Sequence, residues 1–181
     1  MRTRSLTERL TVTAILTGMA VALQVFESTL PILNAVPGGK IGLANTVTLI
    51  LLYIFDFKTA LTCAAVRAFL ASLLYGGVSA IIYSVSGAVL SAVTMALLVR
   101  FVKGLTPIGV SVCGAFCHNA AQVLVACAVM SDLRILTYLP ILGIVSCVSG
   151  VVTGYAVKLS LGYFAKGKMV KDTAAKDRRK E

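Results

Sequence analysis

The sequence predicts an all-α integral membrane protein with six transmembrane helices, and three observations lead to this class. Hydrophobic residues make up 58% of the 181 residues and charged residues 13%, and mean hydropathy is +0.93. A soluble domain has about 25% charged residues and at this size buries only about 70% of the surface that its unfolded chain exposes. The apolar runs show no period-two alternation, which excludes a lipid-facing barrel. A soluble globular protein, a disordered chain and a disulfide-stapled secreted module are excluded too.

Six apolar stretches approach the length of about 20 residues that a spanning helix needs. Charged or turn-forming residues separate each stretch from the next. The predicted spans are Leu10–Phe26, Ile41–Phe55, Thr59–Leu74, Val78–Phe101, Ile108–Met130 and Leu139–Phe164.

The first half of the chain holds three of these spans. The first span has no small-x-small cleavage site at its end, so we expect a retained helix and not a signal peptide. The segment Pro31–Gly39 separates it from the second span, and Asp56–Lys58 separates the second from the third. The second and third spans are short, which predicts tilted or partly interfacial helices.

The second half holds the other three spans, and the breaks before them are Tyr75–Gly77, Lys103–Pro107 and a segment that starts at Ser131-Asp132 and runs on to Pro140. Beyond Phe164 the chain becomes basic. We therefore expect a cytoplasmic N-terminus over residues 1–9, a single membrane domain over 10–164, and a disordered basic cytoplasmic tail over 165–181.

Lysine and arginine placement predicts the orientation. With six spans and the N-terminus inside, all but three of the 17 basic residues are cytoplasmic. The exceptions are Lys40 and Arg134 outside and Arg67 within the third span. Cytoplasmic loops carry an excess of such residues, so we expect a multi-pass plasma-membrane protein with both termini cytoplasmic. The net charge of +10 then reflects contact with anionic lipid and not with nucleic acid.

Arg67 is the most informative candidate for ligand binding. It lies about 12 Å into its span at 1.5 Å per residue. An arginine near the bilayer midplane costs at least ~2.5–3.5 kcal/mol to insert, so it should face a cavity or a polar partner. Snorkelling to the cytoplasmic surface and a purely structural pair are the alternatives.

A second polar group occurs in the fifth span, where Gln122 follows His118 at i+4 and Asn119 at i+3, so that the three side chains share one polar flank of the helix. Together these side chains suit a small polar or anionic ligand. The alternative is interhelical hydrogen bonding, which contributes about 0.6 kcal/mol per pair on average.

The outer segment between the first two spans supplies further candidates. It runs from Glu27 through Lys40 to Asn45 and is rich in proline and glycine. Backbone amides of a Gly-Gly-Lys turn ahead of a helix can hold an anion, although the Walker A pattern is absent. An ordinary structured loop is the alternative.

Small residues recur every four positions on the first span, at Ala14, Gly18 and Ala22. This spacing lets another helix approach closely. Internal packing and docking of a partner subunit both remain open from the pattern alone.

No catalytic or metal-binding motif is apparent. Cys113, Cys117 and His118 fall within one turn, but their spacing is unspecific and no carboxylate is near, so we expect no metal site. The seven acidic residues form no aspartate-rich pair of motifs for magnesium. We expect this chain to be no enzyme and to hold no cofactor.

Several of these residues together resemble the Gx transporter family, which is also described as heptaprenyl diphosphate synthase component I. The resemblance runs from Leu10 to about Phe164. Its motifs are Glu27…Leu30-Pro31, Pro37-Gly38-Gly39-Lys40-Ile41-Gly42-Leu43-Ala44-Asn45, Arg67, Ser84-x-x-Gly87 and Gly114-Ala115-x-x-His118-Asn119-x-x-Gln122.

The family in turn resembles the substrate-binding S components of energy-coupling-factor transporters, which have six helices and no ATPase of their own. In those, small residues on the first helix contact a transmembrane coupling subunit, and the residues at Ala14, Gly18 and Ala22 match that pattern with glycine replacing one alanine. The resemblance names no substrate.

The leading hypothesis is therefore an S-component-like uptake protein for a small vitamin-like or cofactor-precursor molecule. A coupling subunit and cytoplasmic ATPases, which would use the ATP, are its implied partners. The substrate-binding residues we expect are Arg67, His118, Asn119, Gln122, Lys40, Asn45 and Glu27.

Two alternatives remain. The chain can be a noncatalytic membrane subunit that assists a soluble heptaprenyl diphosphate synthase in quinone side-chain synthesis. An ion-coupled solo transporter is less attractive, because cation pathways usually need a carboxylate within the membrane.

Overall fold

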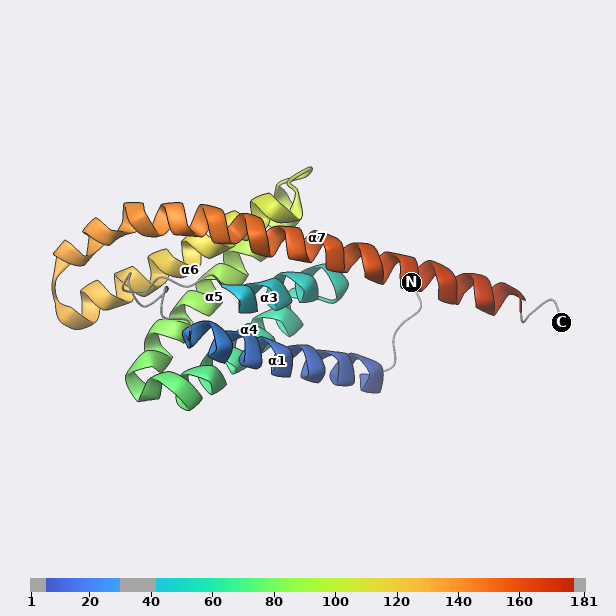
Figure 1. Cartoon of the computed structure of the whole chain (residues 1–181), viewed down its shortest axis with the longest axis horizontal. Helices are drawn as coiled ribbons and strands as arrows, with labels where there is room; N and C mark the ends of the chain where they lie inside the picture. The colour runs from blue at the N-terminus through green and yellow to red at the C-terminus, as the bar shows by residue number, and fades with distance from the viewer. Residues whose placement is uncertain (1–5, 30–41, 178–181) are drawn as a thin grey trace.

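The chain folds into an elongated helical bundle, from which one long helix projects. The computed structural model describes residues 6–29 and 42–177, with side chains through Phe164. Every regular element in these residues is helical, as the sequence predicts. Figure 1 shows α7 running along the bundle and extending beyond the other helices. The elements are α1 (Leu6–Ser28), α3 (Leu43–Ile54), α4 (Phe57–Ala71), a π-helical turn (Ser72–Gly76), α5 (Gly77–Phe101), α6 (Pro107–Met130), a 3-10 turn (Leu133–Tyr138) and α7 (Leu139–Asp177).

Four helical stretches are long and apolar enough to cross a membrane. They are Leu6–Ser28, Phe57–Phe101, Pro107–Met130 and Leu133–Phe164. These four stretches agree with a membrane protein. Judged by length and composition, they are fewer than the six spans that the sequence predicts.

The stretch Phe57–Phe101 is a hairpin. Gly77 follows the π-helical turn and has a φ of 71°, which is readily available to glycine. The chain reverses there, so that α4 and α5 pack side by side (Figure 1). Their contact is built from small residues, with Ala64 and Ala68 of α4 against Ala88 and Ala92 of α5. The 45 apolar residues of this stretch therefore form two antiparallel segments.

The second predicted span is a short helix, as the sequence predicts. Helix α3 has 12 residues, which at 1.5 Å per residue is about 18 Å, against a hydrocarbon layer of about 30 Å. Ile41, the first residue that the prediction assigned to this span, lies outside the described residues. The expectation of six spans therefore stays a prediction.

The last helix is longer than expected. Helix α7 continues past Phe164, where the predicted span ends, through much of the segment 165–181 that we expected to be a disordered tail. No proline follows Pro140, and alanine and lysine, which are frequent in this segment, favour helix. Hydropathy marks where a span ends but not where a helix ends.

Helices α6 and α7 approach each other closely through glycine. A Cβ atom on Gly150 would lie 2.4 Å from Val112 Cα, and one on Gly154 would lie 2.5 Å from Ile108 Cα. The buried hydroxyls of Ser111 and Thr153 hydrogen-bond across the same interface at 2.7 Å. Without a hydrophobic drive between helices in lipid, such close packing and interhelical hydrogen bonds hold them together.

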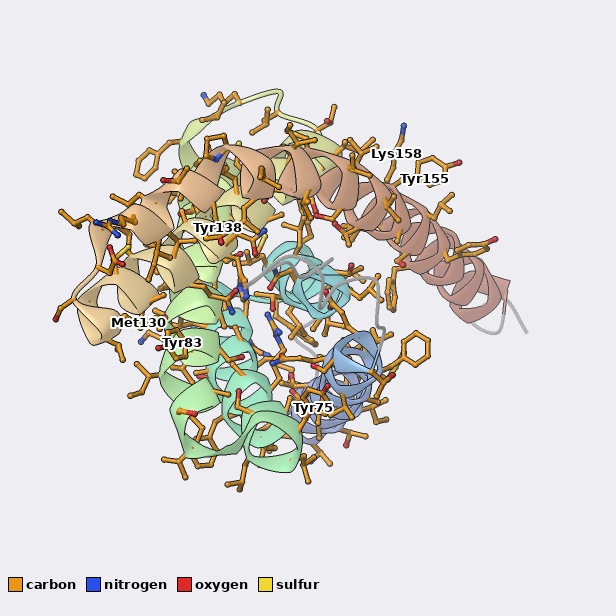
Figure 2. The ribbon with its side chains drawn as sticks, turned by 60° about the vertical axis from the view of Figure 1, so that its left-hand side comes forward. Tyr75, Tyr83, Met130, Tyr138, Tyr155 and Lys158 are labelled. Atoms are coloured by element: carbon orange, nitrogen blue, oxygen red, sulfur yellow. The ribbon has the colours of Figure 1, made fainter. Side chains whose placement is uncertain are left out.

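The opposite side of α7 faces away from the bundle. Ile144, Val148 and Tyr155 are more than half exposed there. Figure 2 shows Tyr155 and Lys158 pointing outward from this helix. An apolar, exposed face of this kind suits contact with lipid.

Asp56 joins α1 to the α3–α4 turn. Its carboxylate caps α4 by accepting from the Thr59 backbone N–H at 2.9 Å, and it forms an ion pair with Arg9 of α1. The Arg9 guanidinium also lies over the Phe55 ring, 5.4 Å from its centroid. The hydrogen bonds from Thr59 and then the charge of Arg9 lower the pKa of Asp56.

Gly150→Ala should destabilise the fold, because the added methyl group meets the backbone of α6, which cannot move aside. We expect a loss of about 1–3 kcal/mol, measured as a lower Tm in detergent. Gly18→Ala is the matched control, because nothing lies within 4 Å of its Cβ position. It should leave Tm unchanged or raise it slightly through helix propensity. Equal Tm values for the two variants would contradict the close approach.

Asp56→Ala should lower stability by about 1 kcal/mol at neutral pH, because α4 loses its N-cap. The folded-state pKa of Asp56 is lowered, so its contribution is present above the unfolded pKa and is lost as pH falls through the folded pKa. The difference in Tm between wild type and variant should therefore shrink in acid. Arg9→Gln, which keeps the cap, should cost less at neutral pH. A difference that is independent of pH would rule out this role for the carboxylate.

Candidate functional site

A buried polar network surrounds Arg67 at the centre of the bundle. The Arg67 side chain is 2% exposed, and it donates from Nη1 to Gln24 Oε1 at 2.8 Å and from Nη2 to Asn45 Oδ1. Gln24 in turn donates from Nε2 to Ser84 Oγ at 2.9 Å. We call Gln24, Asn45, Arg67 and Ser84 the Arg67 network. It links α1, α3, α4 and α5.

Gln24 is the member of this network that sequence reasoning missed. It lies within the apolar first span, three residues before Glu27 and so on the same helical face. A glutamine buried in such a span needs hydrogen-bond partners, and this was the available signal. Arg67 itself points into the bundle and does not snorkel to the surface.

Glu27 holds the start of α3. Its carboxylate is 3% exposed and accepts from the backbone N–H of Gly42 at 2.6 Å and of Leu43 at 3.2 Å. A carboxylate at a helix N-terminus satisfies free N–H groups and interacts favourably with the helix dipole. Because Asn45 follows in the first turn of α3, Glu27 indirectly sets where Asn45 meets Arg67.

Two donors of the Arg67 network have no hydrogen-bond partner among the residues that the structure describes. They are Arg67 Nε and Asn45 Nδ2, both fully shielded from solvent. Buried N–H groups are nearly always paired, so each such exception calls for an explanation. A small ligand that carries an acceptor or an anionic group could satisfy both.

The polar flank predicted on α6 is divided between two interfaces. Asn119 donates from Nδ2 to Ser146 Oγ of α7 at 2.9 Å, and Ser146 donates to the Leu142 carbonyl. His118 lies instead against α5, where a Cβ on Gly87 would be 3.0 Å from its ring. His118 and Asn119 therefore face different neighbouring helices, because adjacent helical residues point about 100° apart, and their contact with one ligand stays a prediction.

Helix α5 connects His118 with the Arg67 network. Ser84, which accepts from Gln24, and Gly87, which contacts His118, are one helical turn apart on the same face. His118 is therefore about one turn from the network. Gln122, a turn further along α6, is 6% exposed, and its Oε1 has no partner in the structure.

The other predicted residues fall at the edges of this arrangement. Lys40 lies outside the described residues. Ala14, Gly18 and Ala22 are all exposed on α1, and nothing lies within 4 Å of the Cβ position of Gly18. This surface is open to another helix, whereas the internal packing alternative has no support from these contacts. Among residues 6–29 and 42–164, no three His, Cys, Asp or Glu side chains come together as a metal site.

Gln24→Leu should be strongly destabilising, because Arg67 Nη1 and Ser84 Oγ would lose their shared partner in the core. We expect at least about 2 kcal/mol, read as a fall in Tm in detergent. Gln122→Leu is the matched control, since both glutamines are 6% exposed but Gln122 makes no such link. The control should be close to neutral. The network has no structural role if the two variants behave alike.

Comparison with known proteins places the chain in a family. No curated protein and no solved structure shows a significant match. The family model of heptaprenyl diphosphate synthase component I matches residues 16–160. The matched region begins in α1 and ends in α7, so it contains the whole Arg67 network and the polar residues of α6. The chain belongs to the heptaprenyl diphosphate synthase component I family.

Proposed function

We propose that this chain is the noncatalytic membrane component of a heptaprenyl diphosphate synthase that serves quinone side-chain synthesis. The observation that carries the proposal is the family match over residues 16–160, in a chain with four helices apolar enough to span a membrane. A component I implies a second component, which we take to be a soluble prenyl transferase. A membrane component would hold that enzyme where its apolar product can enter the bilayer.

The transfer chemistry is assigned to the partner. Prenyl transfer from a diphosphate needs magnesium, which is held by carboxylate oxygens and substrate phosphates. This sequence has seven acidic residues and no aspartate-rich motif. Two of them, Glu27 and Asp56, cap helices. The role left for the chain is to bind, position or anchor.

The exposed face of α1 is the contact surface that we propose for a partner. Ala14, Gly18 and Ala22 form a shallow, small-residue stripe there, and the larger apolar side chains of Ile15 and Met19 beside it are 60% and 52% exposed. Small residues permit close approach of a second helix. We propose the same stripe as the docking site in either functional reading.

A second candidate function is favoured by the Arg67 network. Its two unpaired N–H groups suit an anionic or polar small molecule, as expected for the substrate-binding component of an energy-coupling-factor uptake transporter. In that reading Arg67, Asn45, His118 and Gln122 contact the ligand, with Asn119, Lys40 and Glu27 supporting the site. A coupling subunit and cytoplasmic ATPases would then supply the energy from ATP.

The membrane arrangement that we propose serves both functions. It has six membrane segments, with α4 and α5 counted separately and α3 as the short second segment. Both termini are cytoplasmic in the plasma membrane, and residues 10–164 form the membrane domain between a short N-terminus and a basic tail. This arrangement is supported by the positions of lysine and arginine in the sequence, because nearly all of them then lie on the cytoplasmic side.

The test of the leading proposal is reconstitution with the prenyl synthase of the same cell. The purified chain in lipid vesicles should recruit that enzyme and increase heptaprenyl diphosphate formation, measured by product chromatography. Gly18→Leu should weaken recruitment about tenfold by obstructing the stripe. Gly162→Leu is the matched control, because it also has nothing within 4 Å of its Cβ position but lies on α7. No gain in product with the wild-type chain would contradict the proposal.

Native mass spectrometry of the chain, gently purified from its own membrane, separates the two functions. A retained small molecule, or a bound coupling subunit with ATPases, would favour the transporter. Loss of that small molecule in Arg67→Ala, with a folded protein, would assign it to the network. A bound prenyl synthase without ATPases would favour the synthase component.

A further inference from the structure

An apolar groove lies at the end of the bundle where α3 ends and α4 begins. Its volume is about 410 Å³, and its walls come from α3, α4 and the last turns of α5. This volume is within the range of single small-molecule sites. All of its lining residues are apolar except Arg100. The walls include Leu52, Phe57, Ala96, Leu97 and Phe101.

The groove is separate from the Arg67 network. The two share no residue. Phe57 begins α4, whereas Arg67 comes ten residues later, about 15 Å further along the helix at 1.5 Å per residue. A ligand in the groove would therefore not contact the buried network.

The groove opens on the outer surface of the bundle. Leu97 is 51% exposed, Phe101 70% and Phe57 42%. For a membrane protein this surface faces lipid, where an apolar hollow is filled by hydrocarbon chains. The polar end of such a chain must lie near the end of α5, where the span terminates.

Positive charge gathers at that end. Arg100 lies in the last turn of α5 and is exposed, with its guanidinium 5.7 Å from the centroid of the Phe101 ring. Lys58, next to Phe57, and Lys103, just after α5, are exposed as well. Basic side chains beside the membrane surface attract anionic headgroups.

Acidic groups nearby do not cancel this charge. Asp56 precedes α4, but it is paired with Arg9. Glu8 lies in the first turn of α1, adjacent to Arg9 in sequence. The charges of Asp56 and Arg9 offset each other. The three cations Arg100, Lys58 and Lys103 then outnumber the one other carboxylate of this region, that of Glu8.

We propose that the groove binds one anionic phospholipid, with an acyl chain along Leu97 and Ala96 and the phosphate at Arg100. Arginine binds phosphate through charge-assisted, often bidentate hydrogen bonds. An isoprenyl diphosphate has the same two chemical parts, but phospholipid surrounds the groove at far higher concentration and occupies it by mass action. This proposal does not depend on the function proposed above.

The experiment uses the full chain in mixed micelles that contain equal amounts of phosphatidylglycerol and phosphatidylcholine. Native mass spectrometry then counts the retained lipids. We expect one phosphatidylglycerol to be retained in preference to phosphatidylcholine. Arg100→Gln should reduce that preference about tenfold, and Ala96→Trp should displace the lipid by filling the groove. Because Arg100 is exposed and Ala96 lines the open groove, we expect folded variants, which Tm measurements verify.

Two controls match these variants. Arg134→Gln removes an exposed arginine from the 3-10 turn outside the groove, and Leu124→Trp adds an indole to the exposed face of α6. Both should retain phosphatidylglycerol as wild type does. Equal retention of the two lipids by wild type, or unchanged retention in Ala96→Trp, would overturn the proposal. Displacement of phosphatidylglycerol by farnesyl diphosphate at a concentration well below that of the lipid would overturn it in favour of an isoprenoid site.

Discussion

The buried charge of Arg67 is the constraint on which the first half of the bundle depends. An arginine within hydrocarbon costs several kcal/mol unless polar groups surround it. Gln24 and Asn45 accept its hydrogen bonds, so α1 and α3 must pack against α4 at those positions. Gln24 extends the linkage to Ser84 of α5. One cation thereby determines the relative placement of four helices, and Glu27 supports the arrangement by capping α3.

The second half of the bundle is held together by close helix packing and not by a buried charge. Helices α6 and α7 meet through Gly150 and Gly154, where there is no room for a Cβ, and through the hydroxyl pair of Ser111 and Thr153. Close packing replaces charge as the source of specificity there. Helix α5 belongs to both halves, because Ser84 joins the Arg67 network while Gly87 receives His118.

This division bears on function. The family assignment implies a component that works with a synthase, and the exposed stripe on α1 is the surface that we propose for a partner. The interior combines strong polar groups with two unpaired N–H donors, which an anchor alone would not need. In the functions that we propose, anchoring and ligand binding use different parts of the same bundle, and the apolar groove beside Arg100 is a third surface, which we propose for lipid.

Some features follow from the sequence by itself. Hydropathy and composition determine the helical membrane class, the positions of the main helices and the reversal near Gly77. The cost of a charge in hydrocarbon predicts that Arg67 needs a polar partner or cavity, although it leaves open whether the side chain snorkels to the surface. These are properties of a residue and its neighbours along the chain, so a linear pattern contains them.

Tertiary structure decided the rest. It selected Gln24 as the partner of Arg67 and turned Asn119 toward α7 while His118 faces α5. Each of these outcomes depends on how a helix is rotated about its axis and which neighbour it meets. Hydropathy contains no information on either, because lipid-facing and helix-facing apolar residues are equally hydrophobic.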